Sequence, residues 1–328
     1  MRAAALSPDD PSVIAVARHH RLTPLLSITC GATLPAPLAE MFRRDRLVTG
    51  ARNLLFSQVA EEVLSELTTA GVPTIILKGL DYETRLYGGA AARPTADIDL
   101  LVPSPKRRAA FAVLDRLGFE PRAAAPGFDD ADYHEVAWTR AGIEIDLHMG
   151  LAPLARCRID YGAIWREAET RRLGAAETRA LARPHAAVFQ ALHMAIDHFD
   201  VPAIYLVDLV RLLPTADDAA AALTVARSWR CRRPLETALA LIAVFLPGAA
   251  PIAPTDQRPS HATRRVTVSY GPTDELPRAE QLLRKLLHFD SPSDAVWYVA
   301  IQSRRNLREV FERRFRRRTA RERLALVK

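Results

Sequence analysis

The stretch D-I-D-L-L-V at residues 97–102 alternates acidic and apolar side chains at its start. Residues two apart in a β-strand point to the same face, so we expect Asp97 and Asp99 side by side, with Ile98 and Leu100 facing a core. Two neighbouring carboxylates repel each other unless a cation lies between them. Phosphoryl-transfer sites use divalent ions here, often two ions about 3.5 to 4 Å apart, and oxygen ligands suit Mg²⁺. The motif therefore predicts a Mg²⁺ site for one or two ions.

A third carboxylate lies in a second alternating stretch, E-I-D-L-H at residues 144–148. In a strand, Glu144, Asp146 and His148 share one face. If this strand neighbours the first one, Asp146 completes a three-aspartate metal site, and it is also a candidate general base for an acceptor hydroxyl. For His148 the alternatives are contact with the nucleotide, proton transfer and a structural hydrogen bond.

Basic residues precede the first aspartate pair. Lys78 and Gly79 stand between a predicted strand and a predicted helix. A glycine at this point lets backbone N–H groups approach phosphate oxygens, and a helix N-terminus favours negative charge. We therefore expect Lys78 and Gly79 at the phosphate end of the cleft that holds a nucleoside triphosphate (NTP). Arg93 either binds a phosphate or forms an ion pair with Asp97, four residues later.

A polar group occurs in the predicted helical segment Val188 to Leu213. His193 and Asp197 are four residues apart and so share a helix face, and Asp208 follows. A metal site, a polar wall of the acceptor pocket and a packed structural role are the alternatives. There is no H-E-x-x-H motif, which disfavours the metal site.

The elements that must position these residues are read from the spacing of apolar residues. Strands are expected at 72–77, 98–102, 135–139 and 143–148, and short helices at 80–87 and 106–117. The order predicts an α+β fold with a small mixed sheet. The predicted regions are an N-terminal helical segment (1–70), the sheet-bearing core (71–150), a helical domain (151–255), a linker or long loop (256–279) and a basic helical C-terminus (280–328).

These motifs resemble those of the polymerase-β-type nucleotidyltransferase superfamily and, more narrowly, the bacterial uncharacterised nucleotidyltransferase family. The matching residues are Leu77-Lys78-Gly79, Tyr87, Arg93-Pro94, Asp97 to Val102 and Asp146-Leu147-His148, and beyond them Leu192-His193, His198, Asp208-Leu209 and, more weakly, His20-Arg21-Leu22. The resemblance covers roughly the first two thirds of the chain. It departs from the wider superfamily, because Lys78-Gly79 stands where Gly-Gly or Gly-Ser is usual and the gap to Asp97 is longer. The resemblance implies a nucleotidyltransferase core and transfer from an NTP, but no particular acceptor.

Composition limits the alternatives. The chain has 328 residues, 49% of them hydrophobic, and a formal net charge of +7. No apolar run is long enough to span a bilayer, and the three cysteines form no C-x-x-C pair, so we expect a cytoplasmic protein without disulfides. The segment Arg304 to Arg323 has ten arginines and three glutamates, which accounts for the whole net charge. RNA or another polyanion is therefore a candidate partner of that segment, and a solvated surface helix is the alternative.

The leading hypothesis is a Mg²⁺-dependent enzyme that moves a nucleotidyl group from an NTP to a hydroxyl of a small molecule, a protein or an RNA. The arginine-rich segment leaves two alternatives. One is a non-catalytic RNA-binding protein that keeps the fold, and the other is a toxin-like tRNA nucleotidyltransferase.

Overall fold

A computed structural model describes residues 11–122, 134–152, 157–197, 199, 201–249, 286, 288–300 and 303. Its strands form a seven-stranded mixed sheet in the order β3-β4-β5-β2-β1-β7-β6. The strands are β1 (Ile75–Ile76), β2 (Ile98–Leu101), β3 (Glu120–Pro121), β4 (Glu135–Arg140), β5 (Ile143–His148), β6 (Glu169–Leu173) and β7 (Ala176–Ala180). The mixed α/β class expected from the sequence is confirmed.

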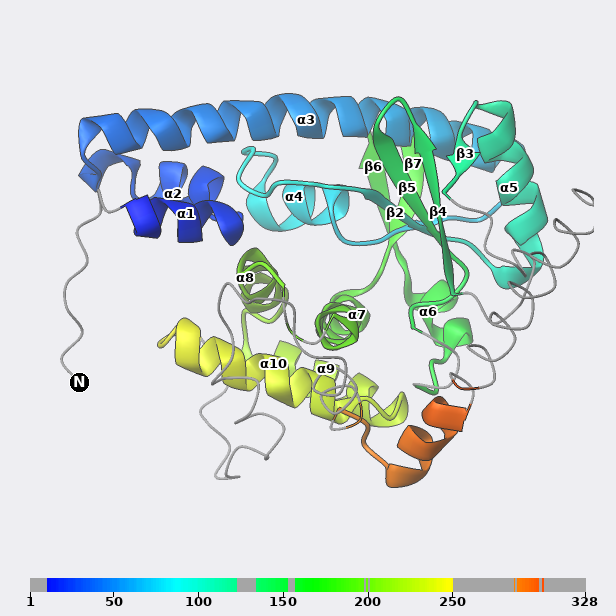
Figure 1. Cartoon of the computed structure of the whole chain (residues 1–328). Coiled ribbons are helices and arrows are strands. Elements are labelled where there is room, and N and C mark those ends of the chain that lie inside the picture. Colours follow the sequence, from blue (N-terminus) through cyan, green and yellow to red (C-terminus); the bar gives the residue numbers. More distant parts are fainter. Residues whose placement is uncertain are drawn as a thin grey trace, which may run out of the picture.

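Helices cover the sheet from both sides (Figure 1). They are α1 (Pro11–His19), α2 (Thr23–Thr29), α3 (Ala36–Thr69), α4 (Leu80–Tyr87), α5 (Arg107–Arg116), α6 (Tyr161–Glu167), α7 (Arg183–Ile196), α8 (Ile204–Leu212), α9 (Ala216–Ser228) and α10 (Arg232–Phe245), with 3-10 turns η1 (Gly31–Thr33) and η2 (Ser104–Lys106). Figure 1 shows the long helix α3 running over the N-terminal helices and the sheet, with α7 to α10 on the other side.

The alternation of side chains along β2 and β5 divides the interior into two cores. Ile98 and Leu100 of β2 and Ile145 and Leu147 of β5 pack in the core beneath α3 and α5. The buried residues of α3 recur every three or four positions, as a helix with one apolar face requires. Those that belong to this core are Phe56, Val59, Ala60, Val63, Leu64 and Leu67. The acidic residues of the two strands therefore point to the opposite face.

A second core lies on that opposite face and is centred on α7. Nearly the whole of α7 is buried, and residues of α8, α9 and α10 surround it. Leu101 of β2 and Tyr82 of α4 belong to this core. The sheet face that bears the aspartates is thus closed in part by α7 and by α4.

The N-terminal helices are tied to this assembly at one turn. The backbone N–H of Ala203 donates to Nδ1 of His20 over 3.2 Å, and that of Ile204 donates to the carbonyl of His20 over 3.3 Å. The turn after α1 is therefore fixed to the start of α8. None of the described helices combines the length and the apolar character needed to cross a membrane.

Two sequence expectations are wrong. Residues 169–180 form the hairpin β6–β7 rather than a helix, and β7 pairs in parallel with β1. The hairpin buries alternate side chains, including Leu173 and Ala176, but its short stretch rich in alanine and arginine conceals the period of two. The predicted continuous helix from Val188 to Leu213 is also broken, because α7 ends at Ile196 and α8 begins after Pro202.

Other expectations fall on residues that are described only in small part. The linker or long loop at 256–279 and the segment Arg304 to Arg323 lie outside the described residues. Of the expected helical C-terminus at 280–328, residues 292–300 are helical.

Candidate active site

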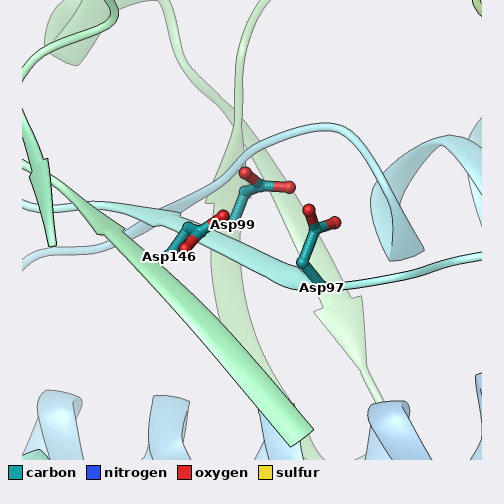
Figure 2. A group of neighbouring side chains, drawn as sticks. All are labelled: Asp97, Asp99 and Asp146. Carbon is teal, nitrogen blue, oxygen red and sulfur yellow. The ribbon is translucent and has the colours of Figure 1, made fainter. Parts of the chain in front are cut away.

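Three carboxylates meet where β2 and β5 run side by side. Asp99 and Asp146 are direct partners in the parallel register of these strands, and Asp97 lies just before β2. One oxygen from each carboxylate lies within 4.8 Å of the others. Figure 2 shows the three side chains turned toward one another. The convergence expected from the two alternating motifs is thus present.

Lys78 lies among these carboxylates. Its Nζ is 3.0 Å from Oδ2 of Asp99 and 3.7 Å from Oδ2 of Asp97, and its side chain is only 4% exposed. Burial opposes the charge of Lys78, but Asp99 and Asp97 outweigh it and raise the lysine pKa. Burial likewise opposes ionisation of Asp99, but Lys78 and His148 lower its pKa. Lys78 and Asp99 are therefore a charged pair at neutral pH.

The other two aspartates are compensated less than Asp99, and Asp97 lies farther than Asp99 from the Lys78 ammonium, at 3.7 Å. Burial, and then the charge of Asp99, raise the pKa of Asp97. The same two causes raise the pKa of Asp146 to about 7. Lys78 is thus shared between Asp99 and Asp97, and the cluster of three carboxylates resists full ionisation unless another cation is added.

His148 supports Asp99 from the same sheet face. Its Nε2 lies 3.1 Å from Oδ1 of Asp99, and its Nδ1 lies 3.4 Å from Oε2 of Glu135 on β4. Burial opposes protonation of the imidazole, but the hydrogen bond to Asp99 raises the His148 pKa. Of the alternatives left by the sequence, a structural hydrogen bond is the one observed here.

Gly79 brings the start of α4 close to the aspartate loop. It has φ of +59°, a conformation that glycine adopts at little cost. A Cβ at this position would lie 3.4 Å from Cγ2 of Thr95 and 3.5 Å from the carbonyl oxygen of Asp97. Lys78 and Gly79 therefore lie beside the carboxylates, as expected.

The loop that leads into Asp97 is clamped from two sides by residues that sequence reasoning missed. Nδ2 of Asn53 on α3 donates to the carbonyl of Arg93 over 3.0 Å, and Oδ1 of Asn53 accepts from the N–H of Thr95 over 3.2 Å. Glu83 on α4 accepts from the N–H groups of Ala91 and Arg93, over 2.6 and 2.8 Å. The Asn53 contacts span 40 and 42 residues and the Glu83 contacts span 8 and 10, so the strand alternation that reveals the aspartates indicates neither.

Arg93 is engaged elsewhere than at Asp97, the ion-pair partner considered from the sequence. Its Nη2 lies 3.0 Å from Oδ2 of Asp208, and its Nε donates to both oxygens of that carboxylate, over 3.1 and 3.0 Å. The Tyr87 hydroxyl also donates to Asp208, over 2.8 Å. Asp208 is fully buried. Of the alternatives for Asp208, the packed structural role is the one observed.

His193 lies on the α7 side of the cluster. Its ring contacts Phe189 and Tyr205, with centroids 6.2 and 5.7 Å apart. Its Nε2 is 3.6 Å from Oδ2 of Asp197. Burial, reinforced by the charge of Lys78, lowers the His193 pKa well below its usual value. A neutral His193 next to Tyr205 fits a polar wall of a substrate pocket. His198 lies outside the described residues.

The donor set fits a divalent cation. Three carboxylates offer hard oxygen ligands, which Mg²⁺ prefers, and Lys78 offsets only one of the three negative charges. Among the described residues, Asp97, Asp99 and Asp146 are the group whose ligand atoms converge in this way.

The chain belongs to the uncharacterised nucleotidyltransferase family, whose model matches residues 7–247. It is therefore a nucleotidyltransferase by family. No curated protein is similar enough to count as a match.

Solved structures of nucleotidyltransferases are similar to this chain in part. A solution structure of the antibiotic-resistance factor ANT(2'')-Ia is 15% identical, covering 54% of this chain and 93% of that one, with a TM-score of 0.40. A crystal structure of ANT(2'')-Ia in complex with adenylyl-2''-tobramycin is 13% identical, covering 53% and 98%, with a TM-score of 0.39. An antigenic nucleotidyltransferase-like protein from Paracoccidioides brasiliensis is 14% identical, covering 56% and 90%, with a TM-score of 0.33.

Proposed function

We propose that this protein transfers a nucleotidyl group from an NTP to a hydroxyl of an acceptor, in a reaction that depends on Mg²⁺. The observation that carries the proposal is the convergence of three carboxylates, from β2, β5 and the residue just before β2, with Lys78 beside two of them. Family membership supports the reaction class. The acceptor is a small molecule, a protein or an RNA.

In this proposal Asp97, Asp99 and Asp146 hold the metal, as one or two ions. Bound Mg²⁺ supplies a Lewis acid that polarises the α-phosphate and makes an acceptor hydroxyl easier to deprotonate. Asp146 is the proposed general base, because its carboxylate lies in the cluster beside Asp99, where it can take the proton of an acceptor hydroxyl. The direct pairing of Asp146 with Asp99 in the register of β5 and β2 supports this role.

Lys78, Gly79 and His148 are proposed to serve the nucleotide. The Lys78 ammonium lies where it can balance phosphate charge, and Gly79 lets the start of α4 approach the loop at Thr95 and Asp97. His148 holds Asp99 in place through their hydrogen bond. Phosphate binding is one of the two sequence expectations for Arg93, but a direct phosphate contact requires its guanidinium to leave Asp208. We therefore propose that Arg93 acts by positioning the aspartate loop.

The test is incubation of the full chain with each labelled NTP, Mg²⁺ and a cell extract, followed by identification of the labelled species. We expect transfer by the wild type and by Glu144→Gln, whose side chain shares the strand face of Asp146 but pairs with Arg122. We expect Asp97→Asn to lower the transfer rate by about 10²- to 10³-fold, as does loss of one electrostatic partner of a transition state. Equal rates for Asp97→Asn and Glu144→Gln would contradict the proposal.

A further inference from the structure

A second site adjoins the carboxylates on the side of the N-terminal helices. A pocket of about 270 Å³ lies between α1, α2, α3 and the loop before Asp97. Its lining includes Arg18, Arg21, Arg52 and, from the loop, Thr95 and Ala96. We propose that this arginine pocket binds a phosphate group of a substrate, with Arg21 as the main cation. The proposal rests on the proposed nucleotidyl transfer, because that reaction supplies the phosphate-bearing substrate.

The charge balance of the pocket favours an anion. Asp45 also lines the pocket, but both of its carboxylate oxygens are bound by Arg18, over 3.0 and 3.2 Å. Arg52 donates to the carbonyl of Ala96 over 3.3 Å, which leaves its charge uncompensated. Within the part of the chain that the structure describes, the Arg21 side chain has no ion-pair or hydrogen-bond partner. Two positive charges therefore remain available, and arginine is well suited to phosphate.

A buried hydroxyl connects the pocket to the carboxylate cluster. Thr95 is 2% exposed, and its Oγ1 has no hydrogen-bond partner among the described residues. Buried polar groups nearly always have one, and Thr95 is one of the residues that line the pocket, so a ligand there is a candidate partner for this hydroxyl. The Cγ2 of the same threonine lies close to Gly79, at the phosphate end of the proposed nucleotide site.

The backbone holds Arg21 in a conformation usually given to glycine. Its φ is +56°. Its N–H donates to the carbonyl of Arg18, and that of Leu22 donates to Ala17, both over 2.9 Å. This is a helix C-terminal motif in which glycine is the common residue. The adjacent His20 is bound to the start of α8. Arg21 is thus set at the pocket wall on a fixed turn.

The chain contains a matched control. Arg230, after α9, also has positive φ, at +54°. Its N–H donates to Arg227, and the N–H of Cys231 donates to Ala226. Its guanidinium lies 3.8 Å from Asp294 and does not line the arginine pocket. Because glycine suits both backbones, Arg21→Gly and Arg230→Gly each remove an arginine without straining the turn.

The experiment titrates pyrophosphate into the full-length protein by calorimetry at low salt without divalent ions. We expect Arg21→Gly to weaken binding about tenfold to a hundredfold, the usual worth of a charge-assisted hydrogen bond. The affinity of Arg21→Lys for pyrophosphate should lie between those of the wild type and Arg21→Gly, and the affinity of Arg230→Gly should match that of the wild type. No binding by the wild type, equal affinity of Arg21→Gly and the wild type, or equal weakening in both glycine variants would overturn the proposal.

A repeat at saturating ATP with Mg²⁺ separates the two sources of a phosphate. If ATP displaces pyrophosphate, the pocket takes the triphosphate tail; if both bind together, it takes a phosphate of the acceptor. The transfer assay stands apart from this measurement. Binding that depends on Arg21 without any nucleotidyl transfer would refute the proposed function and leave the phosphate pocket, whereas transfer with unaltered pyrophosphate binding in Arg21→Gly would refute only the pocket.

Discussion

Two buried charge clusters include the two ends of the segment from Arg93 to Asp97, and they are built differently. Around Asp208, one carboxylate meets one guanidinium, that of Arg93, and receives the Tyr87 hydroxyl as well. Around Asp99, three carboxylates converge, and one lysine, Lys78, contacts two of them. The first cluster is neutral and its hydrogen bonds are made within the chain, as a structural element requires. The second has excess negative charge, which indicates a site for a cation.

The largest effect on stability is expected from the balanced cluster. Arg93→Ala leaves the Asp208 carboxylate buried without its counter-charge, which should lower the free energy of unfolding by about 3 to 5 kcal/mol. Urea denaturation measures this loss. Arg116→Ala is the control, because it breaks a surface pair with Glu66 and should cost about 0 to 1 kcal/mol. Near wild-type stability of Arg93→Ala together with lost NTP binding would instead favour phosphate binding by Arg93.

A smaller effect on stability is expected from the unbalanced cluster, where ionisation of a carboxylate destabilises the fold instead of stabilising it. The folded protein raises the pKa of Asp146 from 3.8 to about 7, so the fold disfavours the ionised form. Its contribution to stability is most favourable below about pH 4 and falls as pH rises through about 7. In a metal chelator, the melting temperature of Asp146→Asn should therefore fall less from pH 5 to pH 8 than that of the wild type.

Added Mg²⁺ provides a second test of Asp146 in the same melting-temperature measurement. Added Mg²⁺ should raise the wild-type melting temperature more at pH 8 than at pH 6, because protons compete with the ion for Asp146. One kcal/mol corresponds to roughly 2 to 4 °C in a domain of 150 to 250 residues. Glu144→Gln should keep the wild-type pH slope. A slope shared by the wild type and Asp146→Asn would show that Asp146 is not the titrating group.

The same contrast explains how much could be predicted from the sequence. The unbalanced cluster is built from two local alternations, at residues 97–102 and 144–148, and a period of two is readable without knowing the fold. The balanced cluster joins Arg93 to Asp208, 115 residues later, and only the packing of α8 against α4 brings them together. The clamp from Asn53 spans 40 residues to Arg93. Neither leaves a signal in the local sequence.

The smallest effect on both clusters is expected from removal of the arginine-rich segment. It holds ten arginines between Arg304 and Arg323 and lies outside the described residues, whereas the carboxylate motifs end at His148. Deletion from Arg304 onward should leave Mg²⁺ and NTP binding unchanged, which calorimetry measures.

If the segment binds an acidic acceptor such as RNA, the deletion should remove the salt dependence of acceptor labelling. For six or more phosphate contacts, affinity falls by about 10³-fold or more between low and physiological salt. Labelling that is retained in full with the same salt dependence would reduce the segment to a solvated surface helix. Loss of NTP binding would mean that the segment belongs to the catalytic fold.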